Sequence, residues 1–254
     1  MKPVSLVYFV MLLFCWQELF AQNNPNEFQE EKPILLKNEA SFGILIHSNG
    51  YGIEGKRSYQ KTYKRKLILE GQLVGMKHPK EIKTINTRYQ NPKSFIYGKM
   101  NTLTILRFAI GEQRILFGKA ERTGVEVRFN YLGGLSFGFV KPVYLLIDRS
   151  DSQNIEANLV AEKYDPTNEY QNNVENIAGR ASFTLGLDQL KPYPGLFTKA
   201  GFNFEYAPYH EDIKSLEVGA ALDIYGKEVP IMAFAKNKQI FLSFYITFIY
   251  GHKW

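Results

Sequence analysis

Hydrophobic and polar residues alternate along the last part of the chain, residues 240–254. The even-numbered positions from Ile240 to Tyr250 are apolar or aromatic, while Ser243 and Thr247 lie on the other parity. Because side chains of a β-strand point alternately to the two faces of a sheet, this pattern predicts a strand with one apolar and one mixed face. The chain then ends on Trp254, which has the parity of the apolar set.

The same alternation predicts strands along most of the chain. It is clearest over 125–139, where Phe129 and its odd-numbered neighbours are apolar, and Gly133-Gly134 is a candidate bulge within that run. Counting each periodic run once gives eight strands. The other seven are expected over 40–59, 67–75, 95–109, 180–188, 196–207, 214–225 and 238–250.

Two segments leave the strand count open. Asn49-Gly50 would close a tight hairpin, but the glycines around it would equally ease curvature, and we favour one long strand over 40–59. A split there and another near Lys141 would raise the count to ten. The segments 61–65, 78–93 and 148–179 are expected to be a turn and two polar loops, and 111–124 a short helix or a hairpin arm.

Composition supports a closed sheet that crosses a membrane. Aromatic residues make up 15% of the chain, with 16 Tyr, 19 Phe and 20 Gly, as expected for a barrel wall with aromatic girdles. Beyond the N-terminal segment no run approaches about 18 consecutive apolar residues, which excludes a helical membrane protein. We therefore predict an all-β, antiparallel transmembrane β-barrel with one long polar loop. The alternative is a soluble β-sandwich or barrel.

The C-terminal strand resembles the terminal signature of bacterial outer-membrane β-barrel proteins. With the Gly-rich aromatic strands and the stretches 78–81 and 141–144, the chain is similar to small outer-membrane barrels of Bacteroidetes-type bacteria. The resemblance implies outer-membrane localisation and recognition of the last strand by the barrel-assembly machinery. The residues that would carry this assembly signal are Phe244, Ile246, Phe248, Tyr250 and Trp254.

The N-terminus is typical of a secretory signal peptide. Lys2 precedes an apolar run, and Ala21 is the expected cleavage site, so the predicted parts are a signal peptide at 1–21, a flexible lead-in at 22–39 and the barrel at 40–254. Cys15, the only cysteine, lies in the signal peptide, so we expect no disulfide in the mature protein. The net charge of +6 is scattered, which favours contact with anionic lipid headgroups and gives no indication of nucleic-acid binding.

If the apolar parity faces outward, a set of polar residues must face the barrel interior. In an eight-stranded barrel the interior is only wide enough for side chains, so these charges are expected to form a salt-bridged plug. A narrow charged channel is the alternative. The predicted interior set is Glu70, Gln72, Glu126, Arg128, Lys199, Asn203, Glu205, Glu217 and Asp223.

No residue pattern indicates catalysis, a cofactor or a metal ion. His47 and Ser48 are adjacent and would point to opposite faces of a strand, and no spacing of His, Asp or Glu fits a metal site. We therefore expect a non-enzymatic barrel with a structural, adhesive or docking role, and a possible envelope partner would contact the loop 148–179. A small channel and a soluble protein that binds an apolar ligand are the alternatives.

Overall fold

The computed structural model describes residues 38–89, 92–118, 124–150, 158–206 and 212–254. The signal peptide predicted at 1–21 lies outside the described residues, as does the predicted lead-in except for its last two positions. The structure described below belongs to one compact unit, 34–254.

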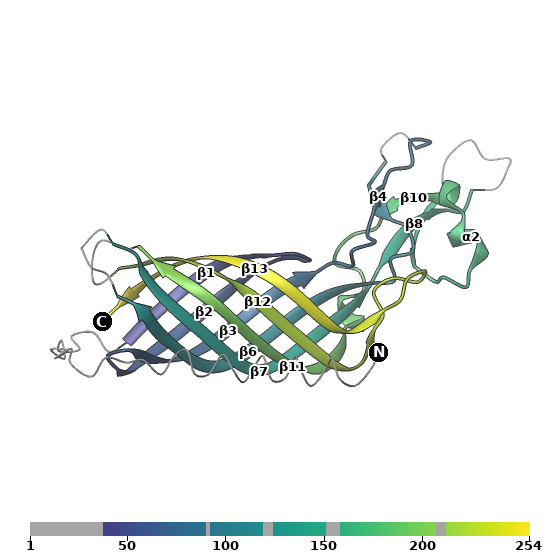
Figure 1. The fold of residues 1–254 in the computed structure, drawn as a ribbon. Helices are drawn as coiled ribbons and strands as arrows, with labels where there is room; N and C mark the ends of the chain where they lie inside the picture. The colour runs from purple at the N-terminus through teal and green to yellow at the C-terminus, as the bar shows by residue number, and fades with distance from the viewer. Residues whose placement is uncertain (1–37, 90–91, 119–123, 151–157, 207–211) are drawn as a thin grey trace, which may run out of the picture. The chain divides into compact units, whose positions relative to one another are not determined.

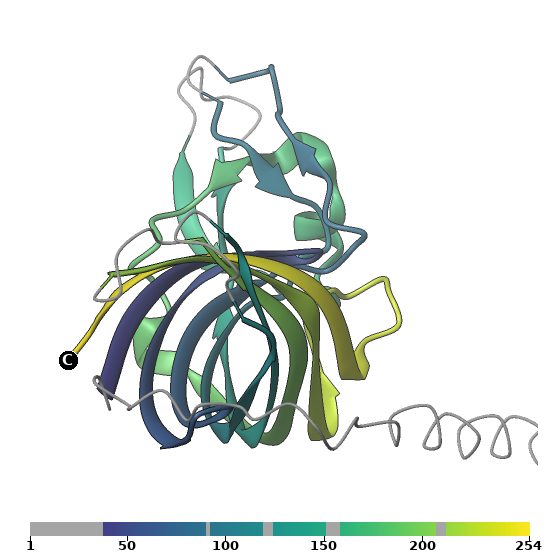
Figure 2. The same ribbon diagram turned by 60° about the vertical axis from the view of Figure 1, so that its left-hand side comes forward.

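Eight antiparallel strands form a closed barrel, which confirms the predicted fold class (Figures 1 and 2). Each barrel strand pairs with the next barrel strand along the chain, and the first pairs with the last to close the ring. The barrel strands are β1 (Asn38–His47), β2 (Gly50–Thr62), β3 (Arg65–Met76), β6 (Asn101–Phe117), β7 (Glu126–Pro142), β11 (Lys191–Glu205), β12 (Asp212–Val229) and β13 (Lys238–Lys253).

A small folded extension follows the barrel at one rim. We use the name for the described residues of 77–100, which connect β3 to β6, and of 143–190, which connect β7 to β11. Its elements are β4 (Lys83–Thr84), β5 (Phe95–Ile96), β8 (Tyr144–Asp148), β9 (Leu159–Lys163), α2 (Glu169–Asn172), η2 (Val174–Asn176), β10 (Ile177–Arg180) and η3 (Leu187–Gln189). The predicted polar loop 148–179 is thus largely folded, because β8 pairs with both β9 and β10.

The prediction of one long strand over 40–59 is wrong. β1 and β2 form a hairpin in which His47 pairs with Gly50 across a two-residue turn. The backbone of Gly50 lies so close to β3 that a Cβ atom would come within 2.0 Å of the Gly75 carbonyl oxygen. The glycine is therefore needed for close approach beside a turn, and it does not mark curvature within one strand.

The strand predicted over 180–188 is also wrong. β10 ends at Arg180, and η3 lies at the end of the predicted range. The ammonium group of Lys141 donates hydrogen bonds to the carbonyl oxygens of Phe183, at 2.7 Å, and Leu185, at 3.2 Å. These acceptors are satisfied by a side chain instead of a neighbouring strand. The two wrong predictions compensate, so the count of eight is correct.

Other findings concern the bounds and continuity of strands. β6 begins at Asn101 and runs to Phe117, so residues 111–117 form an arm of the β6–β7 hairpin, as one of the two predictions for 111–124 has it. Phe95–Ile96, predicted to begin this strand, is the separate β5. The pairing of β7 with both neighbours is continuous through Gly133 and Gly134, so there is no bulge there. β11 begins at Lys191, before Pro192 and Pro194. β11 pairs with β12 only from Gly195 onward, and its prolines lie where one strand edge is unpaired.

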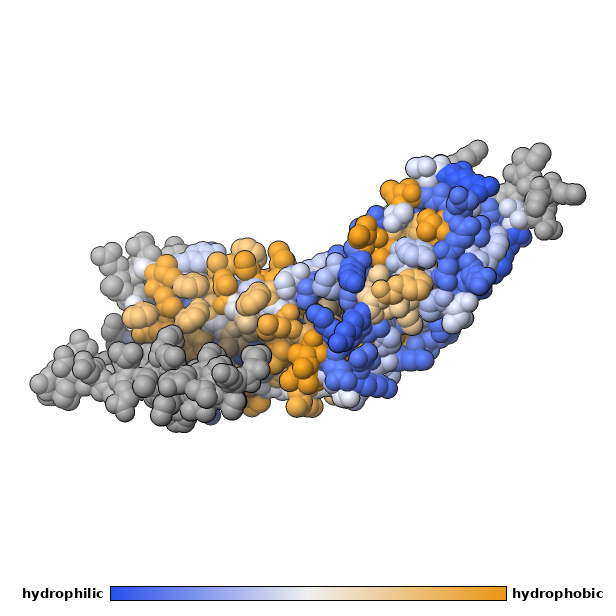
Figure 3. Space-filling view, turned by 45° about the vertical axis from the view of Figure 1, so that its right-hand side comes forward, coloured by the Kyte–Doolittle hydropathy of each residue, from blue (hydrophilic) through white to orange (hydrophobic). Residues whose placement is uncertain are grey.

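Side-chain burial alternates along the barrel strands. On β13, Phe241 and Tyr245 point inward and are buried, whereas Phe244 is 66% exposed and Phe248 58% exposed. Figure 3 shows hydrophobic side chains over the barrel wall and hydrophilic ones over much of the extension. In the described part of the chain, no helix has the length and hydrophobicity to cross a membrane.

The contact between β6 and β7 gives a test of the strand register. A Cβ at Gly134 would lie 1.9 Å from the Phe108 carbonyl oxygen, whereas one at Gly133 would be 3.9 Å from its nearest neighbour. We expect Gly134→Ala to lower the free energy of unfolding by about 1–3 kcal/mol. The matched control Gly133→Ala should change it by less than about 0.5 kcal/mol in the same urea titration. Equal stability of the two variants would contradict this register.

Candidate functional site: the charged interior of the barrel

A cluster of five ionised side chains fills the middle of the barrel. The ammonium nitrogen of Lys199 lies 3.0 Å from Glu54, 3.1 Å from Glu70 and 3.0 Å from Glu217. Lys56 contacts the same three carboxylates at 2.8, 3.4 and 2.6 Å. All five side chains are buried, and they come from β2, β3, β11 and β12. We call these five residues the central cluster.

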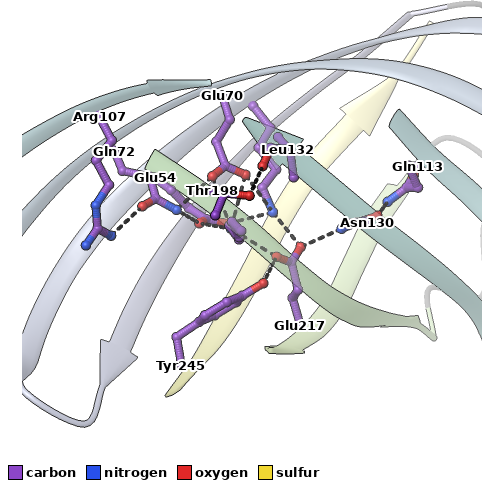
Figure 4. Close-up of polar contacts among 12 residues, drawn as sticks. Glu54, Glu70, Gln72, Arg107, Gln113, Asn130, Leu132, Thr198, Glu217 and Tyr245 are labelled. Atoms are coloured by element: carbon purple, nitrogen blue, oxygen red, sulfur yellow. Dashed lines mark hydrogen bonds and ion pairs between the residues drawn. The ribbon is translucent and has the colours of Figure 1, made fainter. Parts of the chain in front are cut away.

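Neutral donors add hydrogen bonds to carboxylate oxygens that the two lysines of the central cluster also contact (Figure 4). The Gln72 amide donates to Glu54 at 2.9 Å and to Glu70 at 2.7 Å. Glu217 accepts from the hydroxyl of Tyr245 and the amide of Asn130, both at 2.8 Å. Since three carboxylates share two ammonium groups, these donors help to compensate for the cost of taking the charges out of water.

A second ion pair continues the network toward the extension. Arg107 donates two hydrogen bonds to Asp223, at 3.0 and 2.6 Å, and a third to the amide oxygen of Gln72 at 2.9 Å. Asp223 also accepts from Ser136 at 2.9 Å. Because Gln72 contacts both Arg107 and the central cluster, the two groups of charges belong to one hydrogen-bonded network.

A third group of charges lies toward the rim that carries both ends of the barrel. Arg128 pairs with Glu126 and, at 2.6 Å, with Glu205, which also pairs with Lys253 at 2.6 Å. Glu39 pairs with Lys66 at the same rim. Charges of both signs therefore balance closely along the whole interior.

Apolar side chains fill the rest of the interior. One cluster of buried residues, including Leu103, Val140 and Phe241, closes the barrel toward the extension. Another surrounds the central cluster and includes Leu45, Leu132 and Phe197. Inward positions are therefore not uniformly polar, in contrast to the simple rule of apolar residues outside and polar residues inside.

The structure places the predicted interior residues as follows. Glu70, Gln72, Lys199, Glu217 and Asp223 lie in the network around the central cluster, and Glu126, Arg128 and Glu205 lie near the rim. Asn203 also faces inward but donates only to Ser215, at 3.1 Å. The other ionised members of the interior network, which the sequence analysis did not name, are Glu39, Glu54, Lys56, Lys66, Arg107 and Lys253.

The alternation of residues within β2 indicates two interior charges that were not predicted. Glu54 and Lys56 share one parity, opposite Tyr51, Ile53 and Tyr59. The prediction of one strand over 40–59 assigned no interior face to this segment, so it did not include Glu54 and Lys56 in the interior set. Their side chains supply one carboxylate and one ammonium group to the central cluster.

The residues of the predicted assembly signal lie on the outer face of the closing strand. Phe244, Ile246, Phe248 and Tyr250 are all exposed on β13. The indole ring of Trp254 lies 4.2 Å from the Arg57 guanidinium carbon, and its backbone exchanges two hydrogen bonds of 2.9 Å with Asn38. The final residue thus completes the β1–β13 seam.

The extension has its own core and polar links. Phe95, Leu145, Ile147, Tyr164 and Ile177 form a buried cluster. Tyr89 donates to the Asp148 carboxylate at 3.1 Å, and burial together with this hydrogen bond raises the pKa of Tyr89 to about 12. Within the connection 143–190, a hydrogen bond from Arg149 holds the pKa of Glu162 below its usual value. These contacts join 77–100 to 143–180 as one folded body.

The described side chains offer no evident catalytic or metal centre. In the ranges that the structure describes, no group of three or more His, Cys, Asp or Glu residues is arranged to hold a metal ion. The carboxylates of the interior are engaged by cations and amides.

Comparisons with known proteins give weak structural matches. No family model and no curated protein matches the sequence. Neisserial surface protein A is 10% identical with a TM-score of 0.40, and Ail of Yersinia pestis is 9% identical with a TM-score of 0.38; each match covers 86% of this chain and 97% of that chain. The N-terminal β-barrel domain of Pseudomonas aeruginosa OprF is 10% identical with a TM-score of 0.34, covering 86% and 99%. The strand pairing of the chain itself defines the closed barrel.

Removing one cation from the central cluster tests its energetic role. Lys199→Met leaves three buried carboxylates with Lys56 alone, so we expect the free energy of unfolding to fall by about 3–5 kcal/mol. Lys238→Met removes the same charge from an exposed position on β13 and should change stability by less than about 0.5 kcal/mol. Urea unfolding of both variants measures the difference. If Lys199→Met lowers the free energy of unfolding as little as Lys238→Met does, the interior ion pairs contribute little to stability.

Proposed function

We propose that the protein is an integral outer-membrane β-barrel with a plugged interior, which holds a folded extension at the cell surface as a docking element. The observation that carries the proposal is the apolar outer wall. Soluble monomers rarely expose apolar patches larger than a few hundred Å². Here each of the eight barrel strands exposes large apolar side chains. They include Phe42, Ile44, Ile46, Tyr51, Ile53, Leu69, Leu73, Phe108, Ile110, Leu135, Leu196, Phe202, Val218, Ile224, Ile240, Leu242, Phe244, Ile246 and Phe248.

Strand length and closure also favour a membrane location. A tilted strand needs about 9–11 residues to cross a bilayer. The barrel strands contain between 10 and 18 residues. Closure leaves no unpaired strand edge, which a sheet in hydrocarbon requires. The alternative, a soluble barrel that binds an apolar ligand, is not favoured because buried charges and packed side chains fill its interior.

The orientation that we propose for the barrel in the membrane is based on the difference between its two rims. Asn38 and Trp254 meet at one rim, and the extension follows the other. Bacterial single-chain barrels have short periplasmic turns and longer extracellular loops. We therefore assign the chain ends to the periplasm and the extension to the cell surface. The exposed aromatic side chains of β13 and Trp254 suit recognition by the barrel-assembly machinery.

The proposed role is non-enzymatic. The extension presents a folded surface built from two connections, and we propose that the part at 148–179 contacts an envelope partner while the barrel serves as its anchor in lipid. Its buried core and the hydrogen bonds from Asn86 to three backbone carbonyl groups of 174–177 support a preformed docking surface. Preformed surfaces lose less conformational entropy on binding than flexible loops do.

Introducing an arginine on the outer wall of the barrel tests whether this wall faces lipid or water. Phe244 is 66% exposed, so Phe244→Arg creates neither a clash nor a cavity. If the wall faces lipid, we expect a loss of about 2–4 kcal/mol in unfolding from lipid vesicles. Ile82→Arg, at a position of the extension that is 74% exposed, should have an effect below about 0.5 kcal/mol. A small effect of both substitutions would show that the wall faces water.

The plugged interior predicts that the protein does not conduct ions. The central cluster and the apolar cluster on its extension side are both buried in the barrel interior, where they would obstruct an ion path. We expect no steady conductance above the bare membrane when the purified protein is inserted into a planar bilayer. Insertion is checked in parallel by resistance to carbonate extraction and by heat-modifiable gel mobility. Reproducible unitary currents from the inserted protein would instead support the channel alternative.

A further inference from the structure

A pocket with a volume of about 390 Å³ lies where the extension meets the end of the barrel. It is lined by parts of 93–102, by the junction of β7 with β8 and by the residues that follow β10. Five cationic side chains surround it, and none of its described lining residues is acidic. The cations are Lys83, Lys93, Lys99, Lys141 and Arg180.

Among the described residues, most of this positive charge has no carboxylate as a counter-charge. Lys99 pairs with Glu81 at 2.6 Å, and Lys141 is held by the backbone carbonyl groups of Phe183 and Leu185. In the part of the chain that the structure describes, Lys83, Lys93 and Arg180 have no carboxylate within ion-pair distance. Like charges gathered in one pocket repel each other, and a bound anion would relieve the repulsion.

Backbone packing brings the segment of Lys93 against β10, the strand that carries Arg180. Gly179 lies so close to Lys93 that a Cβ at Gly179 would come within 2.5 Å of the Lys93 carbonyl oxygen and 2.7 Å of its Cβ. Arg180 is the next residue along β10. The missing side chain of Gly179 thus allows the segment that carries Lys93 to lie against the strand that carries Arg180.

The pocket also has an apolar side. Phe95, Val143 and Phe183 belong to its lining, and Phe183 is 72% exposed. The Lys141 ammonium group lies 4.3 Å from the centre of the Phe183 ring. Leu185, Leu187 and Leu190, which follow Phe183 along the chain, are exposed as well. Cations next to exposed apolar side chains match a ligand that has both an anionic group and a hydrophobic part.

We propose that this pocket binds the phosphate group of a phosphorylated membrane lipid. A phosphate carries about 1.5 to 2 negative charges and accepts several hydrogen bonds, which suits a group of unpaired Lys and Arg side chains. The apolar segment 183–190 would lie against the lipid part of the same molecule. The proposal rests on the membrane location proposed above, because only then does the rim of the barrel meet lipid headgroups.

Two ligands separate the phosphate group from its carrier. Purified protein in uncharged detergent micelles is titrated with inorganic pyrophosphate, and protein in phosphatidylcholine nanodiscs is titrated with bis-phosphorylated lipid A and with the same lipid after dephosphorylation. We expect binding of pyrophosphate and of phosphorylated lipid A, and at least tenfold weaker binding of the dephosphorylated lipid. Equal binding of the two lipids, or no binding of either phosphate compound, overturns the proposal. Binding of pyrophosphate alone overturns the lipid assignment.

Variants locate the site. Lys93→Gln combined with Arg180→Gln removes two exposed cations, and we expect roughly tenfold or greater weakening for each phosphate ligand. The control pair Lys61→Gln and Lys64→Gln removes the same charge beside the turn between β2 and β3, at the opposite rim, and should leave affinity unchanged. Gly179→Ala retains every charge but displaces Lys93, so it should also weaken binding. Equal affinities of the two charge-removal pairs would overturn the assignment to this pocket.

The micelle titration keeps this proposal separate from the proposed function. Pyrophosphate binding depends on the pocket and does not require a lipid-facing wall. A failure at the pocket therefore leaves the tests of the barrel wall unaffected. Conversely, a wall shown to face water would remove the lipid as a ligand while the pyrophosphate result still reports on the pocket.

Discussion

Closure of the sheet between β1 and β13 is the constraint on which the rest of the structure depends. The seam pairs Glu39 with Lys253 at one end and His47 with Tyr245 at the other, so neither strand has a free edge. A closed sheet necessarily has one enclosed face and one outer face. Because side chains alternate along every strand, the residue chosen at each position decides which environment its side chain meets.

The enclosed face explains why the charges form a network. In so narrow an interior an unpaired ion would be very costly, and the ion pairs have to be made across strands that are distant in sequence. Lys199 and Glu54, for example, are 145 residues apart in the sequence and 3.0 Å apart in space. A shift of one residue in any strand would turn these charges to the outer wall. The network therefore links correct register to stability, which suits a barrel that acts as a fixed anchor for its extension.

The sequence was sufficient to predict what depends on local alternation. The period of two in β7 and β13 correctly indicated strands and their outward faces, because neighbouring positions alone decide these features. The sequence was not sufficient to predict features that depend on contacts between residues far apart in the chain. The hairpin after His47 depends on the approach of Gly50 to Gly75, and the segment after β10 on carbonyl groups bonded to Lys141. The ion-pair partners of Lys199 likewise depend on the register between strands, which cannot be read from the sequence of one strand. The fold of the extension depends on contacts between two connections far apart in the chain.

The claim that the apolar parity faces lipid can be measured position by position. Cys15 is the only cysteine in the sequence. Once it is replaced by serine, single cysteines can be introduced at positions 242 to 248 and labelled with nitroxides. In lipid vesicles, spin-relaxation measurements compare collision with oxygen, which concentrates in the hydrocarbon, and with a water-soluble nickel complex. We predict high oxygen accessibility at the even positions and low accessibility to both reagents at the odd ones. Higher accessibility to the nickel complex than to oxygen at 244 and 246 would contradict a lipid-facing wall.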